Sequence, residues 1–562
     1  MFIRITKNSA GQRYYHLAES YRVGRKVKQR ILLSLGRVED GRLQALSDAL
    51  SKHTKLLSAL EIAKSISVDR AYVLGPLLVL KALFAQLGID EALRLAGRNH
   101  KKLKFNVRDA VFALVCARFT KPSSKLAVYE QLLKRLYPHL APTDLELEHL
   151  YRVLDVLAQD KDLIEKSLFM HGRDLYNRSV DVVLYDLTTL RFESTREDLG
   201  QLCRFGYSKE RRSDCTQVVL GLLVDPEGIP LGFEVYPGNT VETATLKDIV
   251  KKMTKKFSVR RFIVVADRGV LSSKNLDTLR QNGAQFIIGM RIGKLGKKRP
   301  ELFDRKGFER ISDELEILHT SFGIDRGIVA WTKTRAERDR KTRDDIVAKI
   351  VRKLSGKKKV SAKSFISNTN YHAFLKGIDA GVPQLDTDKL AEAEKRDGFF
   401  ALVTNIDDMS PVELWAHYKD LWRIEDSFGE LKGTLKARPV FHWTDHRITG
   451  HLVMCFIALL CEAHITRLAR HNGQTRAGRA SDDGVIESRP LCAAPVIADL
   501  ADVRVVPVTI ADHTYWVRTD IAGNAAQIFR ALGLRIPPNV IRIDSHPGQP
   551  VVAQTNSVDA TV

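Results

Sequence analysis

The sequence predicts an α/β protein built around a mixed β-sheet. Two β-branched runs, VDVVLYD at 180–186 and RFIVVAD at 261–267, each end in an acid, and a hairpin and an amphipathic segment separate them. Strands and helical segments that alternate in this way form a sheet with helices packed against it. In addition, apolar residues recur at three- and four-residue spacing between about 45 and 178, which predicts a helical region ahead of the sheet.

The first 44 residues are predicted to form a small β-rich segment, because short alternating runs indicate an antiparallel sheet with its basic side chains facing solvent. Residues 45–178 follow as the helical region, where Gly88 is expected to cap a helix over YVLGPLLVLKALFAQLG. The region is rich in Lys and Arg but shows no clear helix-turn-helix pattern. DNA contact and a plain scaffold are therefore both open interpretations of it.

The first part of the sheet is assigned to residues 179–290. Within it, TQVVLGLLV and IPLGFEVYPG flank the turn sequence Asp225-Pro226-Glu227-Gly228, which predicts a hairpin. An amphipathic segment, VETATLKDIVKKMTKKF, comes before the second acid-terminated run, and AQFIIGM adds another strand.

Residues 291–397 change character and are predicted to be an inserted, basic, β-rich subdomain. They contain RIGKLGKKRP, VRKLSGKKKVSAK and strand-like pieces such as RGIVAWTKT. The basic runs at 297–299 and 357–359 are interpreted either as solvated loops or as a DNA-facing surface.

The sheet is expected to resume over 398–470 with FFALVTNID, followed by a long helix. Ser410, Pro411 and Glu413 form a capping-box start for this helix. One stripe of the helix then carries Leu414, Tyr418, Leu421, Glu425, Phe428, Lys432 and Leu435. Glu425 interrupts an apolar face, where an unpaired buried carboxylate would cost several kcal/mol. Glu425 should therefore face either a basic neighbour or a water-filled site.

The most hydrophobic stretch, LVMCFIALLC at 452–461, is too short to span a bilayer and predicts a buried helix. Residues 471–562 are expected to form a polar linker (NGQTRAGRASDDG), a hairpin from VRVVPVTI and TYWVRTDI, a short helix and a frayed tail from about 545.

Composition narrows the class of protein. The chain has 562 residues, 89 Lys plus Arg against 67 Asp plus Glu, and a formal net charge of +22. With 44% hydrophobic residues it is globular and not a disordered polycation. Such a charge favours a polyanionic partner, with nucleic acid ahead of a membrane, and a basic protein kept soluble by its charge is the alternative.

Compartment is predicted from the cysteines and the N-terminus. The six cysteines include no C-x-x-C pair, which argues against a zinc knuckle and favours a reducing compartment. The N-terminal residues lack the apolar region of a signal peptide. These features predict a cytoplasmic protein that does not enter the membrane.

Asp186, Asp267 and Glu425 are the candidate catalytic residues. The two aspartates end apolar strands, where a side chain leaves the core for a crevice, although Asp also commonly caps strand ends. Three carboxylates without a nucleophilic Ser or Cys motif suit Mg²⁺. Two such ions would activate a water or a 3′-hydroxyl and stabilise the leaving oxygen at a phosphodiester.

Several motifs resemble those of the DDE transposases of bacterial insertion sequences, in the branch with a β-rich insertion before the last acid. That branch carries a Tyr-(2)-Arg-(3)-Glu-(6)-Lys signature, which Tyr418, Glu425 and Lys432 match. Its arginine position holds Leu421, and Arg423 lies nearby. Across most of 180–465 further motifs are similar to this family: YDLTTL, ADRG, GYSKERR, PLGFEVYPGNT and ARPVFHWTDHRITGHLVMCFIALL.

The resemblance implies an RNase H-like catalytic core in which Asp186, Asp267 and Glu425 bind Mg²⁺, or Mn²⁺ in its place. It implies DNA-backbone contacts by Tyr418 and Lys432, a role that Arg423 is a candidate to share. Trp331 is the candidate in the insertion for stacking on a flipped base, with a core tryptophan as the alternative.

The function implied is DNA cleavage at the ends of a mobile element followed by strand transfer into target DNA. The expected partner is double-stranded DNA, bound by a homodimer, and the protein would associate with the nucleoid. Two alternatives stay open: a metal-dependent nuclease that does not join strands, and a catalytically inactive DNA-binding regulator. His442 and His446 have zinc-like spacing but lack the Glu of H-E-x-x-H, so a helix cap or a DNA-backbone contact is favoured for them.

Overall fold

The computed structural model falls into two units that are described separately. One unit comprises Met1–Tyr72, Arg504–Asp520 and Pro537–Val562, and the other comprises Val73–Val503 and Ile521–Ile536. The structure describes residues 2–24, 26–38, 66–176, 182–198, 200–207, 212, 214–257, 262–292, 299–355, 371, 373–376, 383–471, 475–480, 486–490, 493–510 and 513–545. Residues 297 and 298 of the first basic run, the whole run at 357–359, part of GYSKERR and the tail after 545 lie outside the described residues.

The first unit contains two antiparallel sheets. The N-terminal sheet has the order β1-β2-β3, with β1 at Phe2–Lys7, β2 at Arg13–Val23 and β3 at Lys26–Arg37. Most of its side chains are exposed, which confirms the expected small solvent-facing sheet. A second sheet has the order β21-β20-β19-β4, and its β19–β20 pair is the hairpin that the sequence predicts. The strands of this sheet are β4 (Ser67–Val68), β19 (Arg504–Ile510), β20 (His513–Arg518) and β21 (Val540–Ser545).

The second unit begins with the predicted helical region. Its helices are α2 (Gly75–Gln86), α3 (Ile89–Arg98), α4 (Val107–Thr120), α5 (Lys125–Ala127), α6 (Leu147–Gln159) and α7 (Lys161–Tyr176). Gly88 follows α2 in the left-handed conformation, with φ of 70°, as a helix cap of this kind requires.

A nine-stranded mixed sheet forms the centre of this unit, in the order β11-β12-β13-β16-β10-β9-β6-β7-β8. The central strands β6, β9 and β10 are parallel, and all other neighbours are antiparallel. The mixed sheet and the 217–237 hairpin therefore confirm the sequence prediction. The strands are β6 (Val182–Arg191), β7 (Gln217–Val224), β8 (Pro230–Pro237), β9 (Ile263–Ala266), β10 (Gln285–Met290), β11 (Glu309–Ser312), β12 (Leu315–Phe322), β13 (Asp325–Thr332) and β16 (Phe399–Thr404).

Helices cover both faces of the sheet. On one face, the alternate residues Val183, Tyr185 and Leu187 of β6 pack with α8 (Leu246–Lys251) and α9 (Ser273–Gln281) in the main apolar core. On the other face lie α14 (Pro411–Lys419) and α15 (Trp422–Lys432). Because strand side chains alternate, Asp186 points away from the main core and toward the α14–α15 face.

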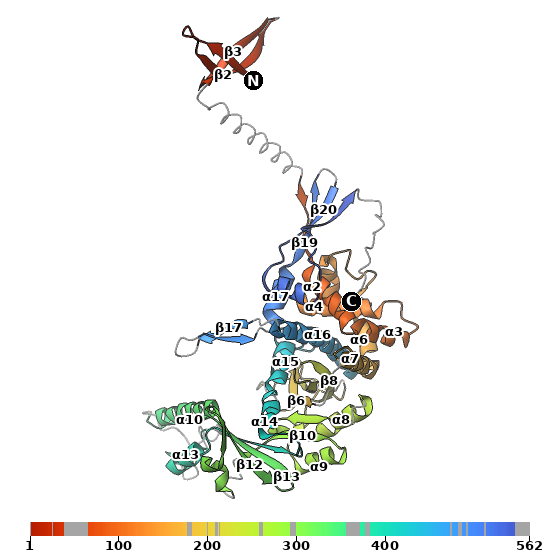
Figure 1. The fold of residues 1–562 in the computed structure, drawn as a ribbon. Helices are drawn as coiled ribbons and strands as arrows, with labels where there is room; N and C mark the ends of the chain where they lie inside the picture. The colour runs from red at the N-terminus through yellow and green to blue at the C-terminus, as the bar shows by residue number, and fades with distance from the viewer. Residues whose placement is uncertain are drawn as a thin grey trace. The chain divides into compact units, whose positions relative to one another are not determined.

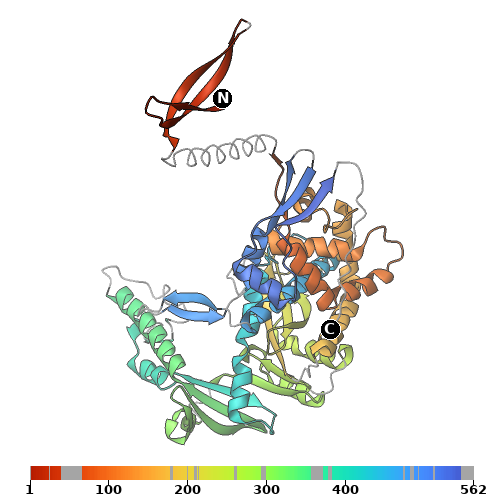
Figure 2. The ribbon, with the colours of Figure 1, turned by 45° about the horizontal axis from the view of Figure 1, so that its top comes forward.

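Strands from residues 291–397 extend this same sheet. β11, β12 and β13 join it through the β13–β16 pair, and the 22-residue helix α10 (Lys333–Leu354) packs beside β13 (Figures 1 and 2). The segment also holds β14 (Leu375–Lys376), β15 (Gln384–Leu385) and α13 (Thr387–Glu394). The remaining elements of the chain are β5 (Tyr72–Val73), β17 (Thr475–Ala480), β18 (Ile486–Pro490), α17 (Ala493–Asp502) and α18 (Gly523–Ala531).

The apolar stretch expected to be a buried helix lies in α16 (Asp445–His471), which runs between α4 and α6 on one side and the sheet on the other (Figure 1). Among the described residues, α16 is the one helix long and apolar enough to cross a membrane by length and composition. However, 89% of its most apolar window is buried inside the protein, so α16 is a core helix.

Two expectations about local structure are wrong. The predicted single helix after Ser410 divides into α14 and α15, because the backbone N–H groups of Leu421 and Arg423 bond three residues back and tighten the turn. The stretch expected to be a polar linker contains a hairpin, since the backbone of β17 pairs with that of β18. Polar composition suggested a loop there, but backbone pairing does not require apolar side chains.

A buried ionic cluster attaches α7 to the sheet. Glu165 is fully buried and lies 2.8 Å from the Nζ of Lys252 and 3.2 Å from that of Lys161. Lys256 also bonds to Glu165, and the backbone N–H of Phe233 in β8 donates to it at 2.9 Å. Burial raises the pKa of this carboxyl, but the lysines outweigh that effect and hold its pKa well below the usual range.

Replacing Glu165 with Gln is expected to lower the free energy of unfolding by about 3–5 kcal/mol, because Lys161 and Lys252 lose their buried counter-charge and keep only the partly exposed Glu234. Since the native-state pKa of Glu165 is depressed, its contribution is present above the unfolded-state pKa of about 4.3 and is lost as the pH falls below it. Urea denaturation at pH 7 and at pH 4 measures both effects. Glu148→Gln, at an exposed i,i+4 pair with Arg152, is the control and should cost about 1 kcal/mol or less. Equal losses for the two variants would contradict the role of the cluster.

Candidate active site

The parallel pairing of β6 with β9 brings two acids to the same level of the sheet. Tyr185 is the register partner of Ala266, so Asp186 and Asp267 occupy the next position on neighbouring strands. Neighbouring strands lie about 4.8 Å apart, and equivalent positions on them face the same side. Asp186 is partly buried and accepts a hydrogen bond from the backbone N–H of Leu187 at 2.7 Å, whereas Asp267 is exposed beyond the end of β9.

Glu425, in the first turn of α15, lies on the wall of the same cavity as Asp186 and Asp267. The volume of this cavity is about 680 Å³. Of the two environments expected for Glu425, a water-filled site is the one observed, since its side chain is exposed into the cavity. The structure thus gathers the three predicted acids from three separate elements.

Tyr418 of α14 reaches the same place. Its hydroxyl donates to Oδ1 of Asp267 at 3.2 Å, and its ring packs on Phe400 with the centroids 5.0 Å apart. This approach depends on Gly289 of β10, because a Cβ at that position would lie 2.6 Å from the Tyr418 hydroxyl oxygen. Burial and the adjacent Asp267 carboxylate raise the pKa of Tyr418, which keeps the hydroxyl protonated as a donor.

Four cations line the same cavity, Arg268, Arg335, Arg338 and Lys419, and Glu314 is a fourth acid in its lining. Arg335 and Arg338 come from α10 of the inserted segment. Burial and the like charges of Arg338 and Arg268 lower the pKa of Arg335. The sequence analysis did not identify these residues, because nothing in the highly charged α10 sequence distinguishes a cavity-facing arginine from a solvated one.

Arg423, Lys432 and Trp331, which the sequence also predicts to contact DNA, are not among the described residues that line this cavity. Arg423 bonds to Asp420 at 3.3 Å, and Lys432 lies at the last turn of α15, partly buried. The indole N–H of Trp331 donates to the carbonyl of Asp397 at 3.1 Å, and its ring lies 3.6 Å beneath the guanidinium of Arg305. This packing agrees with the alternative interpretation of Trp331, in which it is a core tryptophan.

The two histidines with zinc-like spacing separate in the fold. His442 is buried, and its Nε2 lies 2.8 Å from the Nζ of Lys125, while His446 is exposed in the first turn of α16. Burial and the nearby cation lower the pKa of His442 to about 3. Lys125 also lies 3.3 Å from the Nδ1 of His451. His442 therefore belongs to a buried polar cluster that fixes the chain between α15 and α16.

The packing of α15 against α16 involves three further carboxyl groups. Glu462 of α16 is buried and accepts a hydrogen bond from Thr466 at 2.7 Å. Burial, together with the nearby Glu430 of α15, raises the pKa of Glu462 to about 8. The contact is completed by Arg470, which bonds to Asp426 at 3.2 Å.

The donor set of the cavity fits hard, oxygen-preferring cations. The charged oxygens that line it are carboxylates, with the hydroxyls of Thr332, Thr334 and Tyr418 also in the lining. Mg²⁺ is commonly held by one or two carboxylates together with waters and substrate phosphates. Over the described ranges, no three acidic, histidine or cysteine side chains are arranged to hold one ion by themselves. The arrangement therefore suits ions that are shared between the protein and a phosphate-bearing substrate.

Comparison with known protein families gives two matches. Residues 178–461, slightly more than half of the chain, match the family model described as a transposase DDE domain. Residues 3–60 match the model described as the N-terminal domain of the IS1634 family of transposases. No curated protein matches the chain.

The Glu462 carboxyl predicts an unusual pH dependence of stability. A folded-state pKa of about 8, against an unfolded value near 4.3, means that stability falls as the pH rises between these two values. Glu462→Gln, which is neutral throughout, should remove this slope and be more stable than the unchanged protein at pH 8 by at least about 1 kcal/mol. Thermal unfolding between pH 5 and pH 8.5 measures the difference.

The exposed Glu130 supplies the control. Glu130→Gln should give a profile parallel to that of the unchanged protein. A Glu462→Gln profile that is also parallel would show that the Glu462 carboxyl ionises normally in the fold.

Proposed function

The chain belongs to the DDE transposases of bacterial insertion sequences, and from this premise we propose that it binds the terminal inverted repeats of its element, cleaves the element ends and transfers the cut strands into target DNA. The observation that carries the proposal is the single cavity where Asp186, Asp267 and Glu425 meet four cations. Cleavage of a phosphodiester in DNA uses both kinds of group: carboxylates hold the metal ions, and cations bind the neighbouring phosphates.

The strand order supports an RNase H-like core. Strands β8, β7 and β6 are antiparallel, and β9 and β10 continue parallel to β6. We propose that this five-stranded part, with α14 and α15, is the catalytic core, and that residues 291–397 are an insertion into it. The helical region of residues 45–178 is then the proposed DNA-binding part.

Asp186, Asp267 and Glu425 would hold Mg²⁺, or Mn²⁺ in its place, together with the substrate. When bound, these ions supply activation of the attacking water or 3′-hydroxyl and stabilisation of the leaving oxygen. The chain itself orients the Asp267 carboxylate through the Tyr418 hydroxyl and leaves its second oxygen for the ion. Arg335, Arg338 and Lys419 bind the phosphates on either side of the scissile one.

We keep Tyr418, Lys432 and Arg423 in the proposal as contacts near the DNA backbone. Trp331 remains the proposed stacking platform of the insertion, and this role requires that the Arg305 guanidinium leave its face. We further propose that a homodimer holds two element ends, in the cytoplasm and on the nucleoid when bound to DNA.

The acid triad is tested by Asp267→Asn and Glu425→Gln on a duplex that carries the element end, with Mg²⁺, Mn²⁺ or Ca²⁺. Cleavage at the element boundary should need Mg²⁺ or Mn²⁺ and be abolished in both variants, while end binding persists. Asp277→Asn, on the exposed side of α9, is the control and should cleave normally. Cleavage without joining would identify a nuclease, and binding without cleavage under any metal would identify a regulator. Full cleavage by Asp267→Asn would refute the metal role.

The cations of the insertion are tested through salt dependence. Arg338→Ala should reduce the slope of log affinity against log salt by about 1, as expected for one lost phosphate contact. Arg340→Ala removes the same charge from the same helix but lies outside the cavity lining, so its slope should stay the same. Equal slopes for the two variants would exclude a direct phosphate contact by Arg338.

A further inference from the structure

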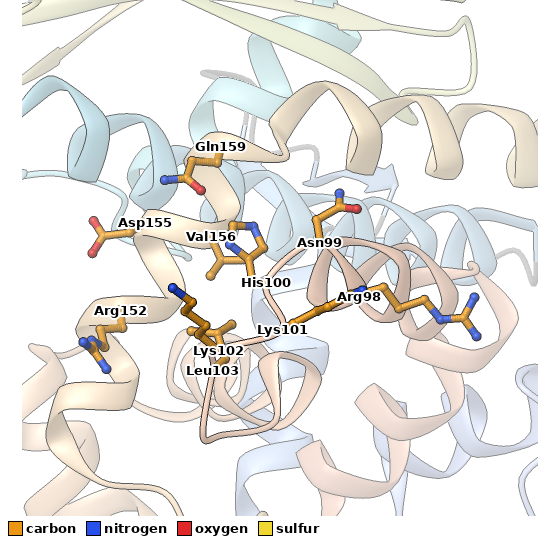
Figure 3. Close-up of a pocket in the computed structure, with 10 residues that line it drawn as sticks. All are labelled: Arg98, Asn99, His100, Lys101, Lys102, Leu103, Arg152, Asp155, Val156 and Gln159. Carbon is orange, nitrogen blue, oxygen red and sulfur yellow. The ribbon is translucent and has the colours of Figure 1, made fainter.

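A second pocket, of about 700 Å³, lies in the helical region between the end of α3 and the C-terminal half of α6. Its lining includes four cations, Arg98, Lys101, Lys102 and Arg152. Figure 3 shows Lys102 and Arg152 extending to the same side of the opening as Asp155, with Arg98 on the other side. The pocket is thus predominantly cationic, although none of the acids of the candidate active site belongs to it.

Arg447 connects this pocket to the start of α16. Its Nε lies 3.4 Å from Oδ1 of Asp155, and its guanidinium is 5.8 Å from the ring centre of Tyr151. Its backbone N–H donates to the hydroxyl of Thr444 at 3.4 Å. The residues just before α16 are therefore neighbours of the pocket, and Arg447 adds a cation between them.

Two aromatic side chains stand out of the protein in that segment: Phe441 is 69% exposed and Trp443 is 51% exposed. They alternate with Val440 and His442, which are buried. The backbone N–H of Val440 donates to the carbonyl of Arg191 at 3.1 Å, and His442 contacts Lys125. The backbone is therefore fixed from behind, and the two rings are held in solvent by the fold itself.

Cations flank the exposed rings along the chain. Arg438 precedes them, and burial together with the like charge of Arg191 lowers the pKa of Arg438. Arg447 follows them with 43% of its side chain exposed. Exposed aromatic rings with cations on either side suit nucleic-acid binding, because bases stack on the rings while phosphates pair with the cations.

We propose that Lys101, Lys102, Arg152 and Arg447, with Phe441 and Trp443, form a second DNA-contacting surface outside the acidic cavity, where the pocket binds backbone phosphates and the rings stack on an unpaired base. This inference rests on the proposed function, since it takes DNA as the substrate. Beyond the proposed function, it assigns a second site that binds DNA phosphates and a place where one base of the duplex is unpaired.

The geometry allows one DNA molecule to reach both places. Phe192, which pairs with Val440, follows Asp186 along β6 and lies about 20 Å from it at about 3.4 Å per residue. DNA advances about 3.4 Å per nucleotide of each strand. The rings should therefore meet the DNA about six nucleotides from the phosphate held at the acids.

The phosphate part is tested with the full chain and an element-end duplex in EDTA, so that no cleavage intervenes. The double variant Lys102→Ala, Arg152→Ala should reduce the slope of log affinity against log salt by about 2. The matched control Lys81→Ala, exposed on α2, should leave the slope unchanged. An unchanged slope in the double variant would overturn the pocket as a phosphate site.

The stacking part is tested with duplexes that carry two unpaired nucleotides about six positions from the end, beside fully paired duplexes. Trp443→Leu should bind the mismatched duplex about 5- to 150-fold more weakly, the range expected for one lost base–aromatic stack. Trp443→Phe should stay within a few fold, because it keeps an aromatic face. Equal binding by Trp443→Leu and the unchanged protein would overturn stacking, and so would a loss by Trp443→Phe as large as that of Trp443→Leu.

The two proposals fail in distinguishable ways. If these variants weaken binding but the unchanged protein never cleaves, the second surface stands and the transposase chemistry falls. If cleavage at the element boundary is normal and no variant changes binding, the chemistry stands and the second surface falls.

Discussion

The parallel register between β6 and β9 is the constraint on which the candidate active site depends. It aligns Tyr185 with Ala266, and so places Asp186 and Asp267 side by side. A slip of one residue would replace Val264 and Ala266 with Ile263 and Val265 on the main-core face and turn Asp267 toward that face. Because an unpaired carboxylate buried there would cost several kcal/mol, such a slip is strongly disfavoured. Burial on one face of the sheet thereby sets the geometry of the acids on the other.

The parts of the fold that sequence reasoning recovered have local signals. Asp186 and Asp267 were identified because each ends an apolar run, and Glu425 because it interrupts an amphipathic stripe. Arg335 and Arg338 were missed, because their role follows from where β13 and α10 pack and no local pattern records that. The separation of His442 from His446 was likewise invisible, since it depends on a lysine more than three hundred residues away in the chain.

The candidate catalytic acids are held in place by other residues that would not contact the substrate themselves. Tyr418 reaches Asp267 because Gly289 leaves space, and α15 is docked on α16 through Arg470 and Glu462. The chain between these helices is fixed by Arg118, which donates to the carbonyls of Leu435 and Lys436 at 3.2 and 2.9 Å. Many of the residues that hold the site in place therefore act through buried polar contacts, and they do not belong to any sequence motif.

The separation of Asp267 from Glu425 in the sequence has a consequence for protein synthesis. Ribosomes add roughly 5–20 residues per second, so Glu425 is added about 8–32 seconds after Asp267. During this interval the nascent chain holds Asp186 and Asp267 but not the α15 wall of the cavity. A growing chain can therefore begin to fold while it still lacks the third candidate acid, and the cavity can be assembled only after α15 has been synthesised.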